Sequence, residues 1–492
     1  MTLFVNALKH LLVQRYRQYG RGKDQSRRSS IIFSSSLLVT ALLAGGLYLD
    51  AIPEVNSQIF HTGPMCPPLL ANHWRTLTDL GEVLGSQSSP DVAGSATGDA
   101  LAVWTRKNGN AYDLYASRYT HPHGFIFSIW ESPTVLGTCK GDFAAHVAMD
   151  SSGTGIAVWE CPEGTRTNIY ANRFTPGGGW GTTVSVENTN YDANSPQIAM
   201  DSWGNAIAVW VQHDSSTSNI YMNRFNPLTG SWGISPTLLE SSRFAAGAPR
   251  VKMSARNGYA IVTWRQGKVH NFTPPSIYAR QLIPAQGWSA TTQIDVNSWD
   301  WQIGWDADVA IDDQGSALVA WLETNGNDQF IYARRYTSGN WDNPVQLDAS
   351  YGYFSSLRLA MNMSGNAMAV WKNRDFGVGG KEFTTSGGWA AGTWVNKSTA
   401  DGQGPRGAMD DAGDAVAVWA QQDNLGGIYN IYGNWYTHPP NCGSSWGTPA
   451  LLETSAQSAF TPQVAVIRPG QAVAVWTQDS ENGRHVYASV YW

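Results

Sequence analysis

Charged side chains are scarce in this chain, and basic ones are scarcer than acidic ones. Charged residues make up 14% of the 492 residues, against about 25% in a typical soluble domain. Lys and Arg total 32 against 38 Asp and Glu, which gives a net charge of -6. With 50 glycines and 23 tryptophans, the composition excludes a disordered chain, a coiled coil and a long helical bundle. The low positive charge also argues against a nucleic-acid partner.

Common motifs for metal and phosphate chemistry are missing as well. The chain has no His-Glu-x-x-His zinc motif and no P-loop. His121 and His123 form a His-x-His in a predicted turn, without a third ligand nearby. The acids that recur in predicted turns supply too few oxygens for calcium and are expected to stabilise those turns: Asp150, Asp201, Asp312 and Asp410. We therefore expect neither a metal nor a cofactor.

A long uncharged run lies near the N-terminus, from Ile31 to Leu49. As a helix, this run would span roughly the 30 Å of a membrane core. Seven basic residues precede it within 1–30, and acidic residues follow it, a bias that keeps the N-terminus in the cytoplasm. The sequence predicts a basic cytoplasmic tail over 1–30, a transmembrane signal anchor over 31–50 and a linker over 51–73. The remainder would be extracytoplasmic, in the periplasm or at the cell surface, or secreted if the signal is cleaved.

A block of about 50 residues recurs eight times along the rest of the chain. Its third copy reads Pro-Gln-Ile-Ala-Met-Asp-Ser-Trp-Gly-Asn-Ala-Ile-Ala-Val-Trp over 196–210. The last tryptophan of the block recurs at intervals of 48–57 residues, as Trp104, Trp159, Trp210, Trp264, Trp321, Trp371, Trp419 and Trp476. A second tryptophan follows each of the first seven copies, from Trp130 to Trp446. The eighth copy ends without one, and its counterpart is Trp74 near the N-terminus.

Each unit is predicted to form four short strands, over 196–201, 206–212, 219–226 and 235–240 in the third unit, because β-branched and aromatic residues alternate between turn residues. Four-stranded units repeated eight times predict an all-β fold, an eight-bladed β-propeller over 74–492. The N-terminal strand after Trp74 would complete the last blade and close the ring, which removes an unpaired edge. The repeated aromatic residues and arginines are expected to be structural, because every blade has the same packing problem.

These units resemble the β-propeller repeats of exported bacterial proteins, a group that includes sialidase-type and lectin-type propellers. The resemblance covers 74–492 and concerns the fold. The Asp-box of sialidases, Ser-x-Asp-x-Gly-x-Thr-Trp, is not present in this chain. The resemblance therefore implies the architecture and leaves the function open.

Departures from the repeat mark the predicted ligand site. The link at 295–308 has tryptophans and acids beyond those of the repeat, namely Trp299, Asp300, Trp301, Trp305, Asp306 and Asp308, and neighbouring links add Phe244, Tyr351 and Tyr353. Aromatic faces beside carboxylates suit a carbohydrate, because apolar sugar faces stack and hydroxyls form hydrogen bonds. The same composition would suit a protein partner, or rings that plug a wide channel.

Two classes of function follow. The sequence favours an extracytoplasmic, non-catalytic binding or scaffold module whose partner is a glycan or a cell-envelope protein. The alternative is a glycan-active enzyme of the sialidase or lyase type. Convergence of carboxylates and arginines near the propeller axis would favour the enzyme.

The four cysteines allow three pairings, and the repeat register selects one. Cys139 lies in the link that enters the second blade, and Cys161 directly follows the second strand of that blade. Cys66 and Cys442 lie in equivalent turns of adjacent blades. The sequence predicts the disulfides Cys139–Cys161 and Cys66–Cys442 in an oxidising compartment, with four free thiols as the alternative.

Overall fold

The structure is a computed structural model. It describes residues 74–75, 77–83, 89–120, 129–214, 217–240, 242–267, 275–295, 303–324, 328–348, 353–373, 377–398, 400, 402–422, 427–438, 443–453 and 455–492. In these ranges the regular elements are strands, and no helix is long and apolar enough to cross a membrane. The tail, anchor and linker predicted over 1–73 lie outside the described residues.

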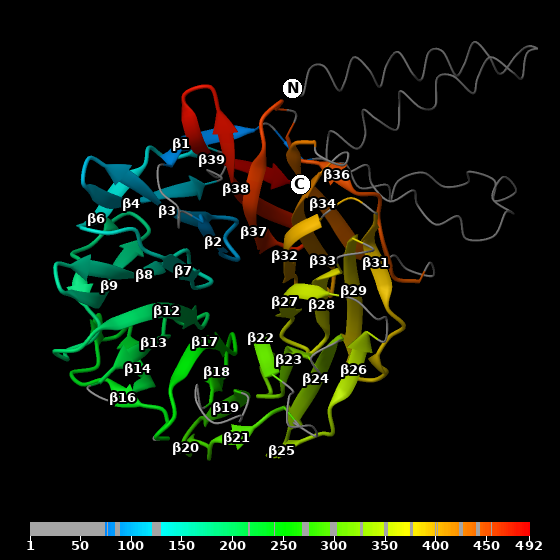
Figure 1. The fold of residues 1–492 in the computed structure, drawn as a ribbon, viewed down its shortest axis with the longest axis horizontal. Coiled ribbons are helices and arrows are strands. Elements are labelled where there is room, and N and C mark those ends of the chain that lie inside the picture. The colour runs from blue at the N-terminus through cyan, green and yellow to red at the C-terminus, as the bar shows by residue number, and fades with distance from the viewer. Residues whose placement is uncertain are drawn as a thin grey trace, which may run out of the picture. The chain divides into compact units, whose positions relative to one another are not determined.

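The strands form eight antiparallel sheets that follow one another around a ring, which confirms the eight-bladed propeller (Figure 1). Blade 1 contains β2 (Asp91–Gly94), β3 (Ala100–Asn108), β4 (Ala111–Thr120), β5 (Ile129–Trp130) and β6 (Thr134–Cys139). Blade 2 contains β7 (Ala145–Met149), β8 (Gly155–Glu163), β9 (Arg166–Thr175), β10 (Gly179–Trp180) and β11 (Val184–Ser185). Blade 3 contains β12 (Ala193–Met200), β13 (Ala206–His213), β14 (Ser218–Asn226), β15 (Ser231–Trp232) and β16 (Thr237–Leu238). Blade 4 contains β17 (Ala246–Met253), β18 (Ala260–Gln266), β19 (Ser276–Ile283), β20 (Gly287–Trp288) and β21 (Thr292–Gln293).

The second half of the ring repeats this order. Blade 5 contains β22 (Ile303–Ile311), β23 (Ala317–Thr324), β24 (Gln329–Thr337), β25 (Asn340–Trp341) and β26 (Val345–Asp348). Blade 6 contains β27 (Phe354–Met361), β28 (Ala367–Asn373), β29 (Gly377–Thr384), β30 (Gly388–Trp389) and β31 (Thr393–Lys397). Blade 7 contains β32 (Gly402–Met409), β33 (Ala415–Gln422), β34 (Tyr429–Thr437), β35 (Ser445–Trp446) and β36 (Ala450–Leu451). Blade 8 contains β37 (Ala459–Arg468), β38 (Gln471–Ser480), β39 (Gly483–Tyr491) and β1 (Thr78–Val83).

The outermost strand differs from the prediction, because in blades 1 to 7 it is split into two short pieces. In blade 3, β15 pairs with β14 through Trp232 and Phe225, and β16 pairs with β14 through Leu238 and Tyr221. Between the two pieces, the Gly233 N–H still donates to the Arg224 carbonyl at 2.9 Å, and residues 234–236 lie outside the strands.

The N-terminal strand closes the ring, as the sequence predicts. β1 pairs antiparallel with β39, from Thr78 opposite Ala488 to Val83 opposite Arg484. Trp74 extends this contact through a β-bridge with Tyr491. The two ends of the chain thus share blade 8, and Figure 1 shows β1 beside β39.

The repeated aromatic residues form the core between blades. Seven of the eight repeated tryptophans are at most 1% exposed, and Trp371 is 3% exposed. Each of these rings removes about 150–250 Å² from water, which stabilises the fold by roughly 4–6 kcal/mol per ring before conformational entropy is counted. The repeated arginines also join blades, since Arg118 lies over the Phe174 ring of the next blade at 5.4 Å. These contacts support the structural interpretation of the repeated residues.

A second contact recurs at two blade junctions, formed by the residue two positions after the buried tryptophan. In blade 4, the indole N–H of Trp264 donates to Gln266 (3.3 Å), and the Gln266 amide donates to Glu240 of blade 3 (2.6 Å). Blade 8 has the same arrangement, with Gln478 donating to Glu453 of blade 7 at 2.9 Å. We call this contact the junction latch.

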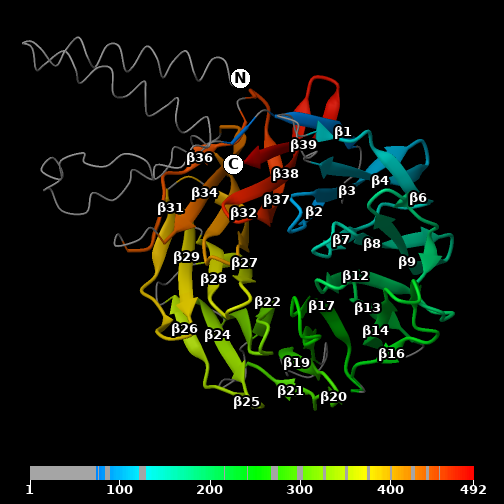
Figure 2. The same ribbon diagram turned by 180° about the vertical axis from the view of Figure 1, so that it is seen from behind.

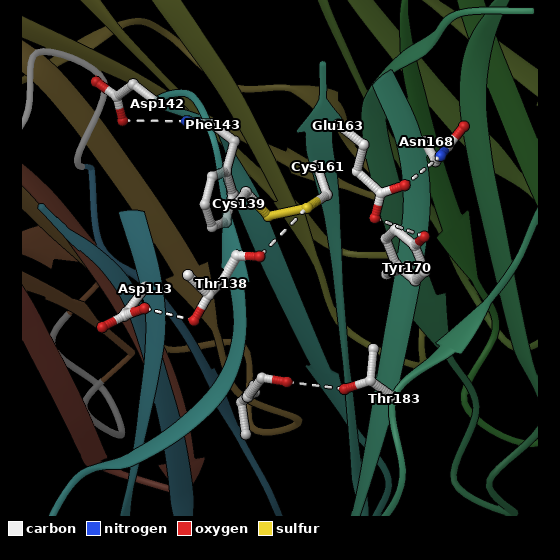
Figure 3. Close-up of a disulfide and its surroundings, with 11 residues drawn as sticks. Asp113, Thr138, Cys139, Asp142, Phe143, Cys161, Glu163, Asn168, Tyr170 and Thr183 are labelled. Atoms are coloured by element: carbon white, nitrogen blue, oxygen red, sulfur yellow. Dashed lines mark hydrogen bonds between the residues drawn. A yellow bond between two sulfur atoms is a disulfide. The ribbon is translucent and has the colours of Figure 1, made fainter. Parts of the chain in front are cut away.

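The predicted disulfide Cys139–Cys161 replaces the latch between blades 1 and 2. Cys161 stands two positions after Trp159, and Cys139 ends β6 of the preceding blade, with the two Cα atoms 5.3 Å apart. Figure 3 shows the covalent bond crossing from one blade to the next. This pairing is confirmed, whereas Cys66 and Cys442 lie outside the described residues.

The latch between blades 4 and 5 is exceptional because it consists of two acids. Asp295 takes the place of Glu240, and Glu323 takes the place of Gln266, two residues after Trp321. Both acids are 3% exposed. Glu323 accepts from the Trp321 indole (2.9 Å), whereas neither oxygen of Asp295 has a partner at normal hydrogen-bond geometry. Burial, reinforced by the Glu323 charge, raises the pKa of Asp295 to about 6.

Candidate functional site at the propeller axis

Six of the eight innermost strands carry a β-bulge at the same place. In β12 the register shifts between Asn194 and Gln197, and Ser195 between them has a φ of 54°. The equivalent residues have similar φ values: Ala248 (51°), Asp306 (45°), Ser356 (57°), Gly404 (56°) and Thr461 (52°). This left-handed conformation costs a non-glycine residue about 1–2 kcal/mol. A bulge re-aims the side chains that follow it, and here the re-aimed position faces the axis.

The residue two positions after each bulge belongs to a ring of eight side chains, one from each blade. Each ring residue pairs with the residue just before the buried tryptophan, as Gln197 does with Val209. The ring residues, in blade order, are Asp91, His146, Gln197, Arg250, Asp308, Arg358, Arg406 and Gln463. Together with Lys252, they line a cavity of about 370 Å³. The strands that carry them, from β2 to β37, lie innermost in Figure 2.

Three guanidinium groups occupy one side of this cavity, on blades 4, 6 and 7. Each Nη1 donates to the carbonyl of the preceding residue, at 3.3 Å for Arg250, 2.5 Å for Arg358 and 3.1 Å for Arg406. Arg358 also forms an ion pair with Asp306 at 3.2 Å. Within the described part of the chain, Arg250 and Arg406 form no ion pair, and Arg406 Nε donates to the amide oxygen of Gln463 (3.0 Å).

Two of these guanidinium groups, those of Arg250 and Arg406, have lowered pKa values. Burial lowers the pKa of Arg250, and the Arg358 charge lowers it further. Burial lowers the pKa of Arg406 to about 9, with additional repulsion from Arg358 and Arg250. Asp306 and Asp308 offset part of this repulsion. An anion in the cavity would relieve the remainder, because opposite charges favour the cationic form.

The carboxylates around the cavity accept hydrogen bonds from backbone N–H groups of the next blade. Asp91 accepts from the Val147 N–H at 3.1 Å, and Asp308 accepts from the Leu359 N–H at 2.9 Å. Asp306 accepts from the N–H of residue 357 at 3.2 Å and also holds Arg358. These acids tie neighbouring inner strands together.

His146 lies on the side of the ring opposite Arg358, four blades away. Its Nδ1 is 3.2 Å from Asp91 Oδ2, and its Nε2 is 2.9 Å from the amide nitrogen of Gln197. An amide nitrogen can only donate, so Nε2 accepts and Nδ1 carries the proton that is donated to Asp91.

The structure places the sequence-predicted ligand residues differently. Asp306 contacts the ring through Arg358, and Asp308 is a ring residue. Phe244 is half-buried under Arg243, and Tyr353 is 56% exposed; neither lines the cavity. For Trp305 the structure describes the backbone, which pairs with Leu322 in β22 and β23. Trp299, Asp300, Trp301 and Tyr351 lie outside the described residues, so the aromatic link remains a prediction.

Sequence reasoning missed most of the ring, although the repeat contains a signal for it. Five of the ring residues follow a proline, and in blades 3, 4 and 7 the motif reads Pro196-Gln, Pro249-Arg and Pro405-Arg. The neighbouring repeat positions stay apolar, whereas this position changes between acid, base and amide. A polar position that varies inside an otherwise regular repeat is typical of a ligand site.

The described residues contain no group of three or more His, Cys, Asp and Glu side chains placed to hold a metal ion. What the cavity offers is a set of hydrogen-bond donors and positive charges on one side, with amides and an imidazole on the other. This arrangement is suited to an anionic ligand that also carries polar groups.

Comparison with known proteins shows the fold alone. No protein-family model matches this chain, and no curated protein matches it. An α-L-arabinanase of Penicillium chrysogenum, solved with arabinobiose, is 10% identical with a TM-score of 0.40, covering 85% of this chain and 98% of its own. The leech intramolecular trans-sialidase is 10% identical with a TM-score of 0.37, covering 80% and 82%. A Dyadobacter fermentans protein of unknown function is 11% identical with a TM-score of 0.40, covering 62% and 96%. The likeness to sialidase-type and arabinanase-type propellers is thus one of fold, as the sequence resemblance implied.

Proposed function

We propose that this protein binds an acidic carbohydrate in the cavity at the propeller axis. The observation that carries the proposal is the pair Arg250 and Arg406, two partly buried guanidinium groups that face one cavity without a carboxylate partner in the described part of the chain. A guanidinium presents a planar set of donors that matches a carboxylate with two parallel hydrogen bonds. The ligand's acid group would therefore bind on the side of blades 4, 6 and 7.

The rest of the cavity supports a sugar rather than a simple anion. Its volume of about 370 Å³ lies at the lower end of the range for small-molecule sites and is large for an inorganic ion. Gln197, Gln463 and His146 line the other side, and their amides and imidazole can exchange hydrogen bonds with hydroxyl groups. A sugar that carries a carboxylate, such as a hexuronate, matches both the arginine side and the amide side of the cavity.

The N-terminal sequence indicates the compartment in which the protein would meet this ligand. The charge asymmetry around 31–50 supports export of the propeller and anchoring to a membrane. In that setting the ligand would be an acidic glycan of the cell envelope or its surroundings. A cell-envelope protein that carries an acidic sugar would be recognised through the same chemistry.

Isothermal titration calorimetry of the full chain tests the proposal, with trigalacturonate as the probe and its methyl-esterified form as the neutral comparison. We expect binding of the acid and little binding of the ester. Arg250→Gln and Arg406→Gln should each weaken binding by about 10–100-fold, since each removes charge-assisted hydrogen bonds of about 1.5–3 kcal/mol. Arg166→Gln is the matched control, because Arg166 is exposed at the start of β9 and contacts Asn190.

The same titration shows whether the cavity or the aromatic link at 295–308 binds the ligand. Trp299→Ala combined with Trp301→Ala should reduce affinity if the predicted link contributes to the ligand site. Loss of binding in this double variant, with full affinity in both arginine variants, would place the ligand on the link and contradict the cavity. Equal affinity for the acid and its ester would also contradict the proposal.

A further inference from the structure

A second layer of side chains lies next to the ring, two residues further along each innermost strand. Because side chains alternate along a strand, residues two positions apart point to the same side, so this layer also faces the axis. The eighth-fold repeat fills it almost uniformly, and seven of its eight positions hold alanine: Ala93, Ala148, Ala199, Ala310, Ala360, Ala408 and Ala465. The remaining position, on β17 of blade 4, holds Lys252.

Lys252 is the one charged side chain in this layer, all eight positions of which the structure describes. It pairs with Ile261 of β18, just as Arg250 pairs with Thr263, and it lines the same cavity as that arginine. Its side chain is exposed and forms no ion pair within the described residues. Alanine satisfies the packing at this position in the other seven blades, so packing does not account for a lysine here.

We infer that Lys252 forms a second anion subsite of the cavity, and that the ligand is an acidic oligosaccharide with acid groups on at least two sugar units. This inference rests on the acidic-sugar binding proposed above and extends it from one acid group to two. Two residues along a strand correspond to about 7 Å, so Lys252 and the ring arginines stand at different levels along the axis. One carboxylate held between Arg250 and Arg406 occupies the first level, and a further acid group of the same chain would meet the ammonium at the second.

The two levels differ in how they bind an anion. The guanidinium groups of Arg250 and Arg406 are planar, and backbone carbonyls and the Gln463 amide hold them in place, so they fix the orientation of one carboxylate. The ammonium of Lys252 is a point charge on a flexible stem, beside a layer of methyl groups. It can follow an acid group whose position depends on the linkage between sugars. The arginines would therefore select the acid group, and the lysine would favour ligands with more than one acidic unit.

Calorimetry of the full chain in 0.15 M NaCl tests the inference with two probes, trigalacturonate and galacturonate, the weaker one measured by displacement of the stronger. Lys252→Ala should weaken trigalacturonate by about 5–10-fold, the effect of one exposed charged contact. It should weaken galacturonate by no more than about twofold, because solvent and salt damp a charge about 7 Å away. Arg250→Gln should weaken both probes, since both place a carboxylate at the arginines.

Two further variants control for charge and for fold. Lys252→Arg keeps the positive charge and should bind trigalacturonate within about threefold of the wild type. Lys397→Ala is the matched control, because Lys397 is exposed on β31 and does not line the cavity. Lys252→Ala gives blade 4 the residue of the other seven blades, so we expect it to fold; should it not fold, Lys252→Gln makes the same comparison.

The outcomes separate this inference from the proposed function. Full trigalacturonate affinity in folded Lys252→Ala, or an equal loss for both probes, would overturn the second subsite and leave acidic-sugar binding in place. Absence of trigalacturonate binding by the wild type would overturn both. A loss confined to trigalacturonate, restored by Lys252→Arg, is the result that the second subsite predicts.

Discussion

Replacing Asp295 with asparagine should stabilise the propeller at neutral pH. Asp295 stands in the junction latch between blades 4 and 5, where the partner position holds Glu323 instead of glutamine. Both side chains are buried, and neither oxygen of Asp295 has a partner at normal geometry. An ionised Asp295 is therefore a buried charge that contacts from the Ile277 backbone and the Gln293 side chain offset only in part. Asparagine removes this charge at almost constant volume.

The magnitude follows from the pKa of this carboxyl, which is raised from 3.8 to about 6, chiefly by burial. A raised acid pKa means that the folded protein binds its proton more tightly than the unfolded chain does. The contribution to stability is complete below about pH 4 and is lost as the pH rises through about 6. At about 1.4 kcal/mol for each tenfold change in proton affinity, the loss reaches roughly 3 kcal/mol above pH 6.

The assay is denaturant unfolding of the wild type and Asp295→Asn at intervals from pH 4 to pH 8. The variant should be more stable by up to about 3 kcal/mol at pH 7.5, and the difference should disappear towards pH 4. Glu323→Gln should give a stabilisation of the same sign, because glutamine can donate to Asp295 as Gln266 does to Glu240.

Glu240→Gln in the neighbouring latch is the matched control. Glu240 accepts from the Gln266 amide (2.6 Å) and from the Ser242 N–H (2.8 Å). Loss of its charge should destabilise the fold by about 1–2 kcal/mol at pH 7. The reasoning would be refuted if Asp295→Asn destabilised the protein at pH 7.5, or if its effect did not change with pH.

Three further predictions concern the stability of the propeller. Cys139→Ala with Cys161→Ala should lower the free energy of unfolding by about 3 kcal/mol, since the disulfide closes a loop of 22 residues; non-reducing denaturant titration measures this. Deleting residues 74–84, which include β1, should expose the edge of β39 and cause aggregation, so a monomer in size-exclusion chromatography would contradict ring closure. Burial lowers the pKa of His438, but hydrogen bonds to Glu382 and a second carboxylate raise it overall. That contribution to stability, below about 1 kcal/mol because the side chain is 36% exposed, should be complete below pH 6.5 and fade at higher pH, and His438→Gln should abolish it.

The architecture was predictable because it rests on local, repeated rules. The spacing from Trp104 to Trp476 gives the number of blades, and the displaced Trp74 reveals how the ring closes. The pairing of Cys139 with Cys161 followed from the same register. Each of these inferences uses residues at positions that pack in the same way in every blade. Because the same residue types recur at those positions, the pattern is easy to recognise in the sequence.

The site was harder to predict, because it depends on where eight separate strands point. A bulge at Ser195 or Ala248 reverses which side chains face the axis, and alternation alone does not reveal a bulge. Arg250 and Arg406 are about 150 residues apart in the chain, and their convergence follows from ring geometry rather than from spacing. Excess tryptophan and aspartate drew attention to 295–308, which holds Asp306 and Asp308, whereas the arginines that crowd the cavity lie inside the regular repeat.

The most direct test of the central claim is a crystal structure of the full chain soaked with a galacturonate disaccharide. The proposed binding mode places the sugar carboxylate between Arg250 and Arg406, with the hydroxyl groups of the sugar towards Gln197 and His146. Density for the sugar away from the axis, or an empty cavity at saturating ligand in a protein that binds it in solution, would contradict this binding mode.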